Sequence, residues 1–484
     1  IQNLNKLSGQ NYKGGEHHYF VDGSPIVRDV YFDNTLGWRT VLIGTLRAGG
    51  KAMFALDVTD PDNIKLLWEF DSSNDIDLGY TFAQPEIVRL HTGQWAVLQG
   101  NGYNSTNDKA ALMVIDIKTG ALLKKIVVPP VVEGNVTLPN GLSSVRAADN
   151  NGDGLADYAY AGDLQGNLWR FDLVPTTTAA DDPTSDPFNR NQNIFNSNSF
   201  TPAQFKLSYG NEPLFVARDA QGLRQPITIQ PSLVRHPTNL GYLVLVGTGK
   251  YFENGDANVD TSRAMSLYGI WDRKTRRQTT QALPVNIRVR ANLQKQQFEQ
   301  QQIAAQFDNN GTPISNDIRL LSQNSVKWYR NLNTGEEFDP TNDDFVEKWG
   351  WRLDLAVENN GSQTLAGEMV VNNMAARGTT LLASSLTPND DPCQAGAITW
   401  FYGINAHTGG RTLKNVLDLN NDRRFDSKDK YQNQVVTGRR FSAPGGFTLS
   451  PGGVFGEGGQ PPMTLPPIIG APRQSWHIIP EDFQ

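Results

Sequence analysis

Apolar and polar positions alternate along much of the chain in one repeated pattern. An alternating strand ends in Gly, a turn follows, and a second alternating strand ends in Asp. The pattern occurs at 41–58, 97–117, 159–173 and 244–272, and in a looser form at 381–409. Short alternating runs bounded by turn residues are typical of β-strands. Each of the five segments is therefore predicted to contain two strands joined by a turn.

Further strands flank these pairs. Two copies continue past their Asp into another apolar run, at 57–70 and 116–128. Short strands are predicted upstream of four copies, at 24–27, 84–88, 143–149 and 230–234. Units of about four antiparallel strands that repeat along a chain indicate a β-propeller, because neighbouring units cover each other's faces. We expect an all-β fold, a modified seven-bladed β-propeller, with six or eight blades or separate β-sandwiches as alternatives.

Some segments interrupt the repeat. Polar insertions are expected at about 175–208 and 284–345, and a Gly/Pro-rich irregular segment at about 443–473. Within the second insertion, 290–307 lacks alternation and contains strong helix formers, so we expect a short helical excursion on the surface there, with a mobile excursion as the alternative. The remainder of 1–484 is predicted to form a single propeller domain.

The composition excludes several classes of function. The 484 residues include 45 Gly and 27 Pro, which favours short strands and turns. A net charge of −7 gives no basic footprint for nucleic acid, and no apolar run is long enough to span a membrane. A single cysteine, Cys393, excludes a disulfide within the chain. Since the sequence starts at Ile1 without Met or a signal peptide, we expect it to be a processed product or an excised piece of a longer protein.

The stretch DLNNDRRFDSKD at 418–429 has the spacing of a calcium loop. Such loops take side-chain oxygens from positions 1, 3, 5 and 9, a carbonyl from 7 and a carboxylate from 12. Arg423 replaces the usual Gly at position 6, which predicts mild strain in the turn. The predicted calcium ligands are Asp418, Asn420, Asp422, the Arg424 carbonyl, Asp426 and Asp429. A polar turn is the alternative.

A second stretch, DNNGDGLAD at 149–157, has the same opening spacing and Gly154 at position 6. Position 12 is Tyr160, so water or a distant residue would have to complete the ligand shell. A predicted strand follows at once, so this loop should join two strands. The predicted calcium ligands are Asp149, Asn151, Asp153, the Leu155 carbonyl and Asp157.

Other functions have less support. Turns such as IDIKTG at 115–120 are similar to those of quinoprotein dehydrogenases, but one cysteine excludes the adjacent cysteine pair that those enzymes often contain. Nucleophile, zinc-protease and phosphate-loop motifs are absent, so we expect no catalytic activity. Aromatic residues near turns, including Tyr103, Tyr251 and Phe252, leave a calcium-dependent, lectin-like adhesin as the alternative function. Core packing is their commoner role.

Three segments together resemble one family. HHYFVDGSPIVRDV (17–30), FALDVTDP (54–61) and DNNGDGLADYAYAGDLQGNLWRFDL (149–173) are similar to the C-terminal propeller of PilC/PilY-type type IV pilus biogenesis and tip proteins. The most specific segment is 149–173, where the loop runs directly into a Gly-Asp strand pattern. The likeness extends from about residue 17 to at least residue 430.

The resemblance implies a modified seven-bladed propeller with calcium bound at 149–157. It also implies that calcium occupancy regulates pilus extension, retraction, twitching motility and surface adhesion. Minor pilins and the pilus machinery would be partners, with host-cell or abiotic surface receptors as further ones. The location would be the pilus tip, the outer membrane and cell surface, or the periplasm of a Gram-negative bacterium. The sequence departs from the family in lacking RGD, the integrin-binding tripeptide, and the loop at 418–429 is not carried over from the whole family.

Overall fold

The chain is built from β-strands. The computed structural model describes residues 19–150, 152–174, 201–273, 289–307, 313–330, 345–359, 362–389, 397–420, 422–441, 447–450, 453–456 and 463–464. Within these ranges the helices are short 3₁₀ turns of three or four residues. The predicted all-β class is therefore confirmed. The described residues up to Pro213 form one compact unit and those from Leu214 onward form another, and each is described by itself.

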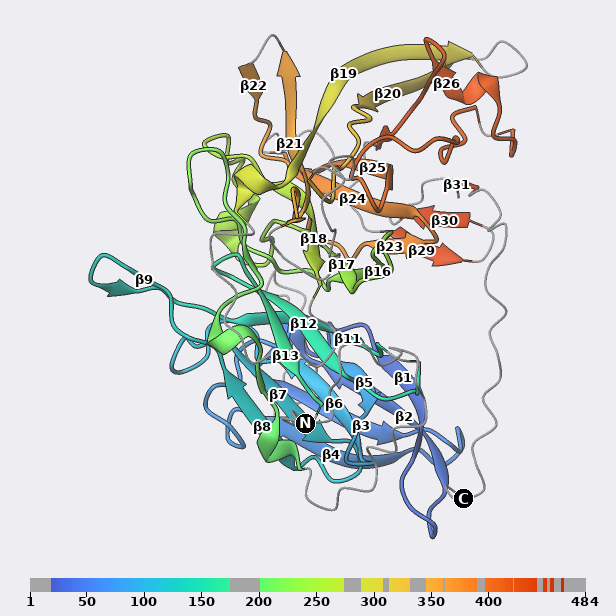
Figure 1. Ribbon diagram of the computed structural model, residues 1–484. Helices are drawn as coiled ribbons and strands as arrows, with labels where there is room; N and C mark the ends of the chain where they lie inside the picture. The colour runs from blue at the N-terminus through green and yellow to red at the C-terminus, as the bar shows by residue number, and fades with distance from the viewer. Residues whose placement is uncertain are drawn as a thin grey trace, which may run out of the picture. The chain divides into compact units, whose positions relative to one another are not determined.

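The first unit contains three consecutive antiparallel sheets (Figure 1). In each sheet, neighbouring strands in the chain are neighbours in space, as expected for the repeated units. The strands are β1 (Ile26–Tyr31), β2 (Trp38–Thr45), β3 (Ala52–Asp57) and β4 (Lys65–Asp71); β5 (Glu86–Arg89), β6 (Trp95–Gly100), β7 (Ala111–Asp116) and β8 (Leu122–Val127); and β11 (Leu142–Ala148), β12 (Tyr158–Asp163), β13 (Asn167–Asp172) and β14 (Lys206–Leu207).

The middle sheet of this unit buries both of its faces. On β6, Val97 packs in a cluster with Met53 and Trp68 of the first sheet. The next residue, Leu98, lies in a different cluster with Ala159 and Phe171 of the third sheet. Successive strand residues point to opposite faces, so one strand contributes to two cores. Stacking of the sheets therefore stabilises the unit, because no sheet covers its own apolar residues.

The largest sheet of the second unit is continuous across eleven strands. Two four-stranded groups, β16-β17-β18-β21 and β23-β24-β25-β28, are joined through β19 and β20. Strand β19 pairs in parallel with β21 on one side, and β20 pairs with β28 on the other. The strands are β16 (Ser232–Arg235), β17 (Tyr242–Gly247), β18 (Ser266–Asp272), β19 (Gln294–Phe307), β20 (Pro313–Leu321), β21 (Gly350–Asn359), β22 (Ser362–Thr364), β23 (Ala375–Arg377), β24 (Thr380–Pro388), β25 (Ala397–Asn405) and β28 (Gly438–Phe441).

The helix predicted at 290–307 is wrong. Apart from a 3₁₀ turn at Arg290–Asn292, this segment is the 14-residue strand β19 (Figure 1). Gln296 of this strand is fully buried, and its Nε2 donates to the carbonyls of Asn324 and Thr408 at 2.7 and 2.9 Å. Pairing with distant strands and these hydrogen bonds outweigh the intrinsic helix preference of Gln and Ala.

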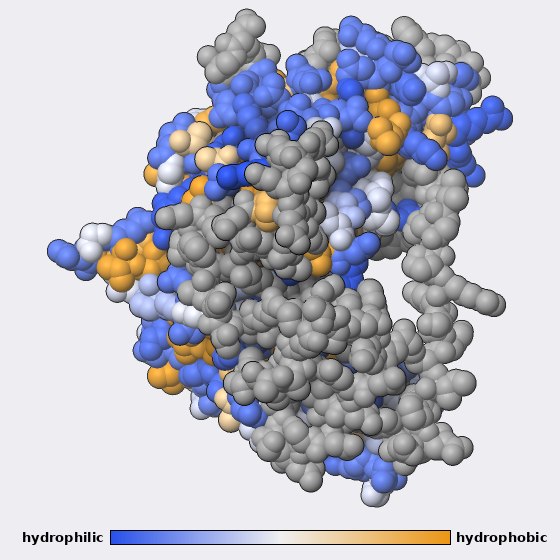
Figure 2. Space-filling model, in the orientation of Figure 1, coloured by the Kyte–Doolittle hydropathy of each residue, from blue (hydrophilic) through white to orange (hydrophobic). Residues whose placement is uncertain are grey.

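The remaining strands are short. They are β9 (Val132–Glu133), β10 (Val136–Thr137), β15 (Phe215–Val216), β26 (Lys430–Tyr431), β27 (Gln434–Val435), β29 (Phe447–Ser450), β30 (Gly453–Gly456) and β31 (Met463–Thr464). The hairpin of β9 and β10 projects from its unit, and Figure 2 shows hydrophobic surface on it, consistent with the exposed Val132 and Val136. Among the described residues, no helix is long and apolar enough to cross a membrane.

Several predictions fall where the structure gives no description. Residues 175–200 of the first insertion and Cys393 lie outside the described residues, as does most of 443–473. The count of seven blades and the single domain over 1–484 stay predictions.

Candidate metal centres

The loop at 149–157, called loop one, joins β11 to β12 as predicted. The two strands are antiparallel, with Ala148 opposite Tyr158 at the base of the loop. Position 3 of the loop, Asn151, lies outside the described residues. The strand pair fixes where both ends of loop one lie.

Asp149, at position 1, organises the first half of loop one. Its Oδ1 accepts hydrogen bonds from the amides of Gly152 and Asp153 at 2.6 and 3.2 Å, and its Oδ2 accepts one from Gly154 at 2.8 Å. Gly152 and Gly154 have φ angles of 77° and 87°, which glycine adopts at low cost. The backbone therefore wraps around this carboxylate, as the predicted spacing requires.

Asp157 organises the second half of loop one. Its side chain is buried, and its Oδ2 accepts a hydrogen bond from the amide of Asn150 at 2.6 Å. The exposed Asp153 accepts one from the amide of Leu155 at 2.8 Å. Carboxylates from positions 1, 5 and 9 are thus all tied to the loop's own backbone.

The loop at 418–429, called loop two, is packed more deeply. Its apolar residue Leu419 is fully buried in a cluster with Ile318 and Leu320 of β20. Among the predicted ligands, Asp418, Asn420 and Asp429 are buried, Asp422 and Asp426 are half-buried, and Arg424 is exposed. Burial of a carboxylate is costly unless hydrogen bonds or a cation compensate its charge.

The two loops share the same internal hydrogen bonds. The amide at position 6 donates to the carboxylate at position 1 at 2.8 Å in both, from Gly154 in loop one and from Arg423 to Asp418 in loop two. The amide at position 7 donates to the carboxylate at position 5, also at 2.8 Å in both. Two stretches far apart in the sequence therefore fold into the same turn.

The loops differ in which carboxylate accepts the hydrogen bond from the amide of position 2. In loop two this acceptor is Asp429 at position 12, with Leu419 N to Oδ1 at 2.8 Å. In loop one it is Asp157 at position 9. Asp157 therefore takes the hydrogen bond that position 12 takes in loop two, although Tyr160 occupies position 12 of loop one.

In both loops, neighbouring carboxylates repel each other. Burial raises the pKa of Asp149, and the charges of Asp157 and Asp153 raise it further, against the hydrogen bond from Gly154. Burial raises the pKa of Asp429 to about 6, and the charges of Asp418 and Asp422 contribute in the same direction. A bound cation would remove this repulsion.

The donor sets suit a hard cation, since carboxylate, amide and carbonyl oxygens are the ligands that Ca²⁺ prefers. In the part of the chain that the structure describes, no three His, Cys, Asp or Glu side chains converge as a ready-made metal site. The case for Ca²⁺ in the two loops therefore rests on the shared turn, the oxygen donors and the mutual repulsion of the carboxylates.

Residues outside the two loops contact them, and no local sequence signal identified these residues. His91 Nε2 lies 2.8 Å from Asp157 Oδ1, 66 residues away in sequence. In loop two, the buried Arg439 of β28 donates from Nη1 to the carbonyl of Asp418 at 3.2 Å. Both contacts come from elements that only the fold brings near.

Arg423 at position 6 stores the strain that the sequence predicted. Its φ of 63° lies in the left-handed region, which costs about 1–2 kcal/mol for a residue with a Cβ. Arg423→Gly removes this strain and should stabilise the second unit by roughly 0.5–1 kcal/mol, which is less than the strain itself because glycine loses more chain entropy on folding. Gly154→Ala should destabilise the first unit by about 1–2 kcal/mol through φ alone, since an added Cβ would meet nothing within 4 Å.

Urea denaturation with a chelator present measures both changes. Gly255→Ala is the control, because its Cβ would also meet open space and its φ is not in the left-handed region. If Gly154→Ala and Gly255→Ala changed the free energy of unfolding equally, the predicted strain from a positive φ at position 6 would be contradicted.

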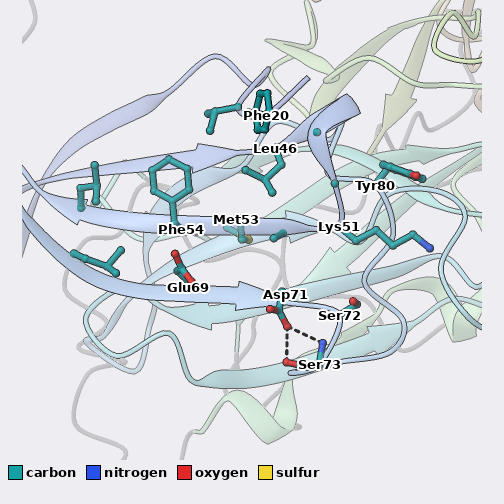
Figure 3. Close-up of a pocket in the computed structure, with 16 residues that line it drawn as sticks. Phe20, Leu46, Lys51, Met53, Phe54, Glu69, Asp71, Ser72, Ser73 and Tyr80 are labelled. Carbon is teal, nitrogen blue, oxygen red and sulfur yellow. Dashed lines mark hydrogen bonds between the residues drawn. The ribbon is translucent and has the colours of Figure 1, made fainter. Parts of the chain in front are cut away.

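The first unit also contains a pocket of about 850 Å³ beside β3 and β4 (Figure 3). Leu46 and Phe54 contribute apolar side chains to its lining. Asp71 at its edge is held by Ser73, which donates from its amide at 2.7 Å and its hydroxyl at 2.6 Å. The hydrogen bond from the Ser73 side chain is the main cause that lowers the pKa of Asp71. This carboxylate therefore caps a turn, and the pocket adds no ligand to either loop.

Comparisons with known proteins identify close relatives. The family model described as the PilY1 beta-propeller domain matches residues 1–310. The type IV pilus biogenesis factor PilY1 of Pseudomonas aeruginosa (strain UCBPP-PA14) is 49% identical over 450 residues, which are 93% of this chain and 37% of that protein. A PilY1 homolog of Xylella fastidiosa (strain Temecula1) is 34% identical over 426 residues, covering 86% of this chain and 24% of that protein.

A solved structure is also similar. The crystal structure of the Pseudomonas aeruginosa PilY1 C-terminal domain matches with a TM-score of 0.77 and 46% sequence identity. The match covers 94% of this chain and 86% of that chain. The chain itself spans little more than a third of the length of the Pseudomonas relatives.

Proposed function

The chain belongs to the PilY1 β-propeller family, and we propose that it is the calcium-binding part of a type IV pilus biogenesis and tip-associated protein. Family membership confirms the predicted propeller fold. The pilus role rests on the function for which the relatives are named, and those relatives are much longer than this chain. The main observation that supports calcium binding is the turn shared by loop one and loop two.

Both loops would hold calcium through their own oxygens. Loop one contributes the side chains of Asp149, Asn151, Asp153 and Asp157 and the Leu155 carbonyl. Loop two contributes Asp418, Asn420, Asp422, Asp426, Asp429 and the Arg424 carbonyl. Bound calcium supplies positive charge that neutralises the carboxylates and links the two halves of each loop.

Calcium occupancy regulates pilus extension and retraction in this proposal, and through them twitching motility and surface adhesion. A ligand shifts a conformational equilibrium only by its difference in affinity for the two states. In this proposal loop one provides such a difference, because its carboxylates repel each other without a cation and this repulsion favours a looser loop that binds calcium less well. Partners would be minor pilins and other parts of the pilus machinery, at the pilus tip, the cell surface or the periplasm. No catalytic step is part of this function.

Calorimetric titration of the chelator-stripped protein tests calcium binding. Two binding events are expected in the wild type, with loss of one event in Asp153→Ala and of the other in Asp422→Ala. Each substitution removes a position-5 carboxylate that accepts its loop's position-7 amide. Calcium binding by the double variant with wild-type stoichiometry would contradict the assignment of both loops.

The same two variants, placed in the bacterium, test regulation. Surface pili and twitching should change in Asp153→Ala while the amount of exported protein stays the same. Normal piliation with a proven empty loop one would refute the regulatory role and leave calcium as a structural ion.

A further inference from the structure

His91 contacts loop one from the neighbouring sheet. It lies in the turn that connects β5 to β6, 66 residues before Asp157 in sequence. Its Nε2 is 2.8 Å from Asp157 Oδ1, and the two side chains are only 1% and 9% exposed. A polar contact this deeply buried is shielded from competing water, so it restricts both side chains strongly.

The contact completes the restraint on Asp157. One carboxylate oxygen accepts from the loop's own Asn150 amide at 2.6 Å, and the other faces His91. The backbone of Asp157 is held as well, since its amide donates to Ala148 and its carbonyl accepts from Leu173, both at 2.9 Å. Without His91, the Oδ1 side of the carboxylate would lose this restraint.

The hydrogen-bonding roles follow from the chemistry of the pair. An ionised carboxylate only accepts hydrogen bonds, so Nε2 of His91 donates. In the described structure, Nδ1 of His91 is buried and has no hydrogen-bond partner. The imidazole therefore directs its polar interaction to Asp157, unlike His236, whose Nδ1 contacts Thr238 within its own turn.

The end of β5, just before the β5–β6 turn, is also attached to loop one. The amide of Ala156, next to Asp157, donates to the carbonyl of Arg89 at 2.9 Å. The charge of Asp153 also acts on Arg89, where it opposes the lowering of the arginine pKa by burial. Loop one therefore contacts the end of β5 and the β5–β6 turn through a backbone hydrogen bond, a side-chain hydrogen bond and a charge interaction.

We infer that His91 is a positioning residue for calcium in loop one, and that it couples occupancy of that loop to the β5–β6 turn of the neighbouring sheet. His91 holds Asp157 in the orientation that places its carboxylate toward the loop interior. Residues that orient a metal ligand typically change affinity by 10- to 100-fold when removed. This role rests on the calcium site of the proposed function, and it adds a residue that the loop sequence does not contain.

Calcium titration of His91→Ala, His91→Gln and His91→Asn in the full chain tests the role. Loop-one affinity should fall about tenfold or more in His91→Ala. It should largely recover in His91→Gln, because the amide nitrogen of Gln reaches the position of Nε2, whereas Asn is too short. Thr92→Ala is the matched control, since Thr92 lies in the same turn and its hydroxyl donates to the exposed Gln94. Loop two should bind calcium normally in every variant.

Hydrogen exchange of the turn separates positioning from general destabilisation. The amide of Leu90 donates to Gln94 and that of Gly93 donates to Leu90, both at 2.9 Å. Calcium should slow the exchange of these two amides in the wild type and in His91→Gln, but much less in His91→Ala. A merely structural role would lower protection equally with and without calcium.

The outcomes are distinguishable. Wild-type affinity in His91→Ala, with calcium still slowing exchange at Leu90 and Gly93, would overturn the inference while leaving the calcium site intact. Equal affinities in His91→Gln and His91→Asn would also overturn it, and these variants keep the test valid if His91→Ala does not fold. No calcium binding to loop one in the wild type would overturn the proposed site and the inference together.

Discussion

Glu368→Ala is expected to lower the free energy of unfolding of the second unit by about 3–5 kcal/mol. Glu368 and Arg319 are both buried, and Arg319 Nη1 donates to Glu368 Oε2 at 2.6 Å. The other oxygen, Oε1, accepts from the hydroxyls of Ser385 and Tyr402, each at 2.5 Å. Removing the glutamate would leave a buried arginine without its carboxylate and two hydroxyls without their acceptor.

The position of Arg319 makes this cost hard to avoid. Arg319 belongs to β20, and its guanidinium lies 4.0 Å from the ring centroid of Trp400 on β25. Burial lowers the pKa of Arg319, but the charge of Glu368, together with Tyr402 and the hydrogen bonds to both, more than offsets this, so the arginine stays charged. The pair therefore fastens the inserted strand β20 to the following four-stranded group.

Guanidinium denaturation followed by tryptophan fluorescence measures this effect. Glu253→Ala is the control, because Glu253 and Lys250 form an exposed ion pair in the same unit. Such pairs contribute less than about 1 kcal/mol. A loss below 1 kcal/mol for Glu368→Ala would show that Arg319 finds another partner or reaches water.

Removing calcium should lower the melting temperature of the wild-type protein by about 5–10 °C. Binding to the folded state alone adds RT ln(1 + [L]/Kd), about 2.7 kcal/mol at a hundredfold excess over Kd. For units of roughly 200 residues, each kcal/mol changes the melting temperature by about 2–4 °C. Repulsion among the carboxylates of each loop is the physical source of this dependence.

Calorimetric melting in calcium and in excess chelator tests this second effect. The double variant Asp153→Ala/Asp422→Ala should melt at the same temperature in both solutions. Magnesium at equal concentration is the control for ionic strength, because these loops offer more ligands than magnesium prefers. Identical wild-type melting with and without calcium would leave both loops as polar turns.

Much of the local structure could be predicted from the sequence. The segment 244–272 covers most of β17 and all of β18, and 97–117 covers most of β6 and all of β7, because alternation and turn residues are local signals. The spacing of both Asp-rich loops was equally informative. A carboxylate at position 1 and a residue with positive φ at position 6 define the turn, and both are visible in sequence.

The tertiary structure alone decided the features that depend on distant residues. The segment 290–307 has helix-forming composition, yet it is a strand because β20 and β21 supply hydrogen-bonding partners. His91 approaches Asp157 because β5 and β11 belong to neighbouring stacked sheets, and no local pattern records that contact. Alternation and loop spacing are properties of adjacent residues, so a single sequence determines them. Burial, ion pairs such as Arg319–Glu368 and the orientation of Asp157 depend on which strands meet, and only the folded chain determines those.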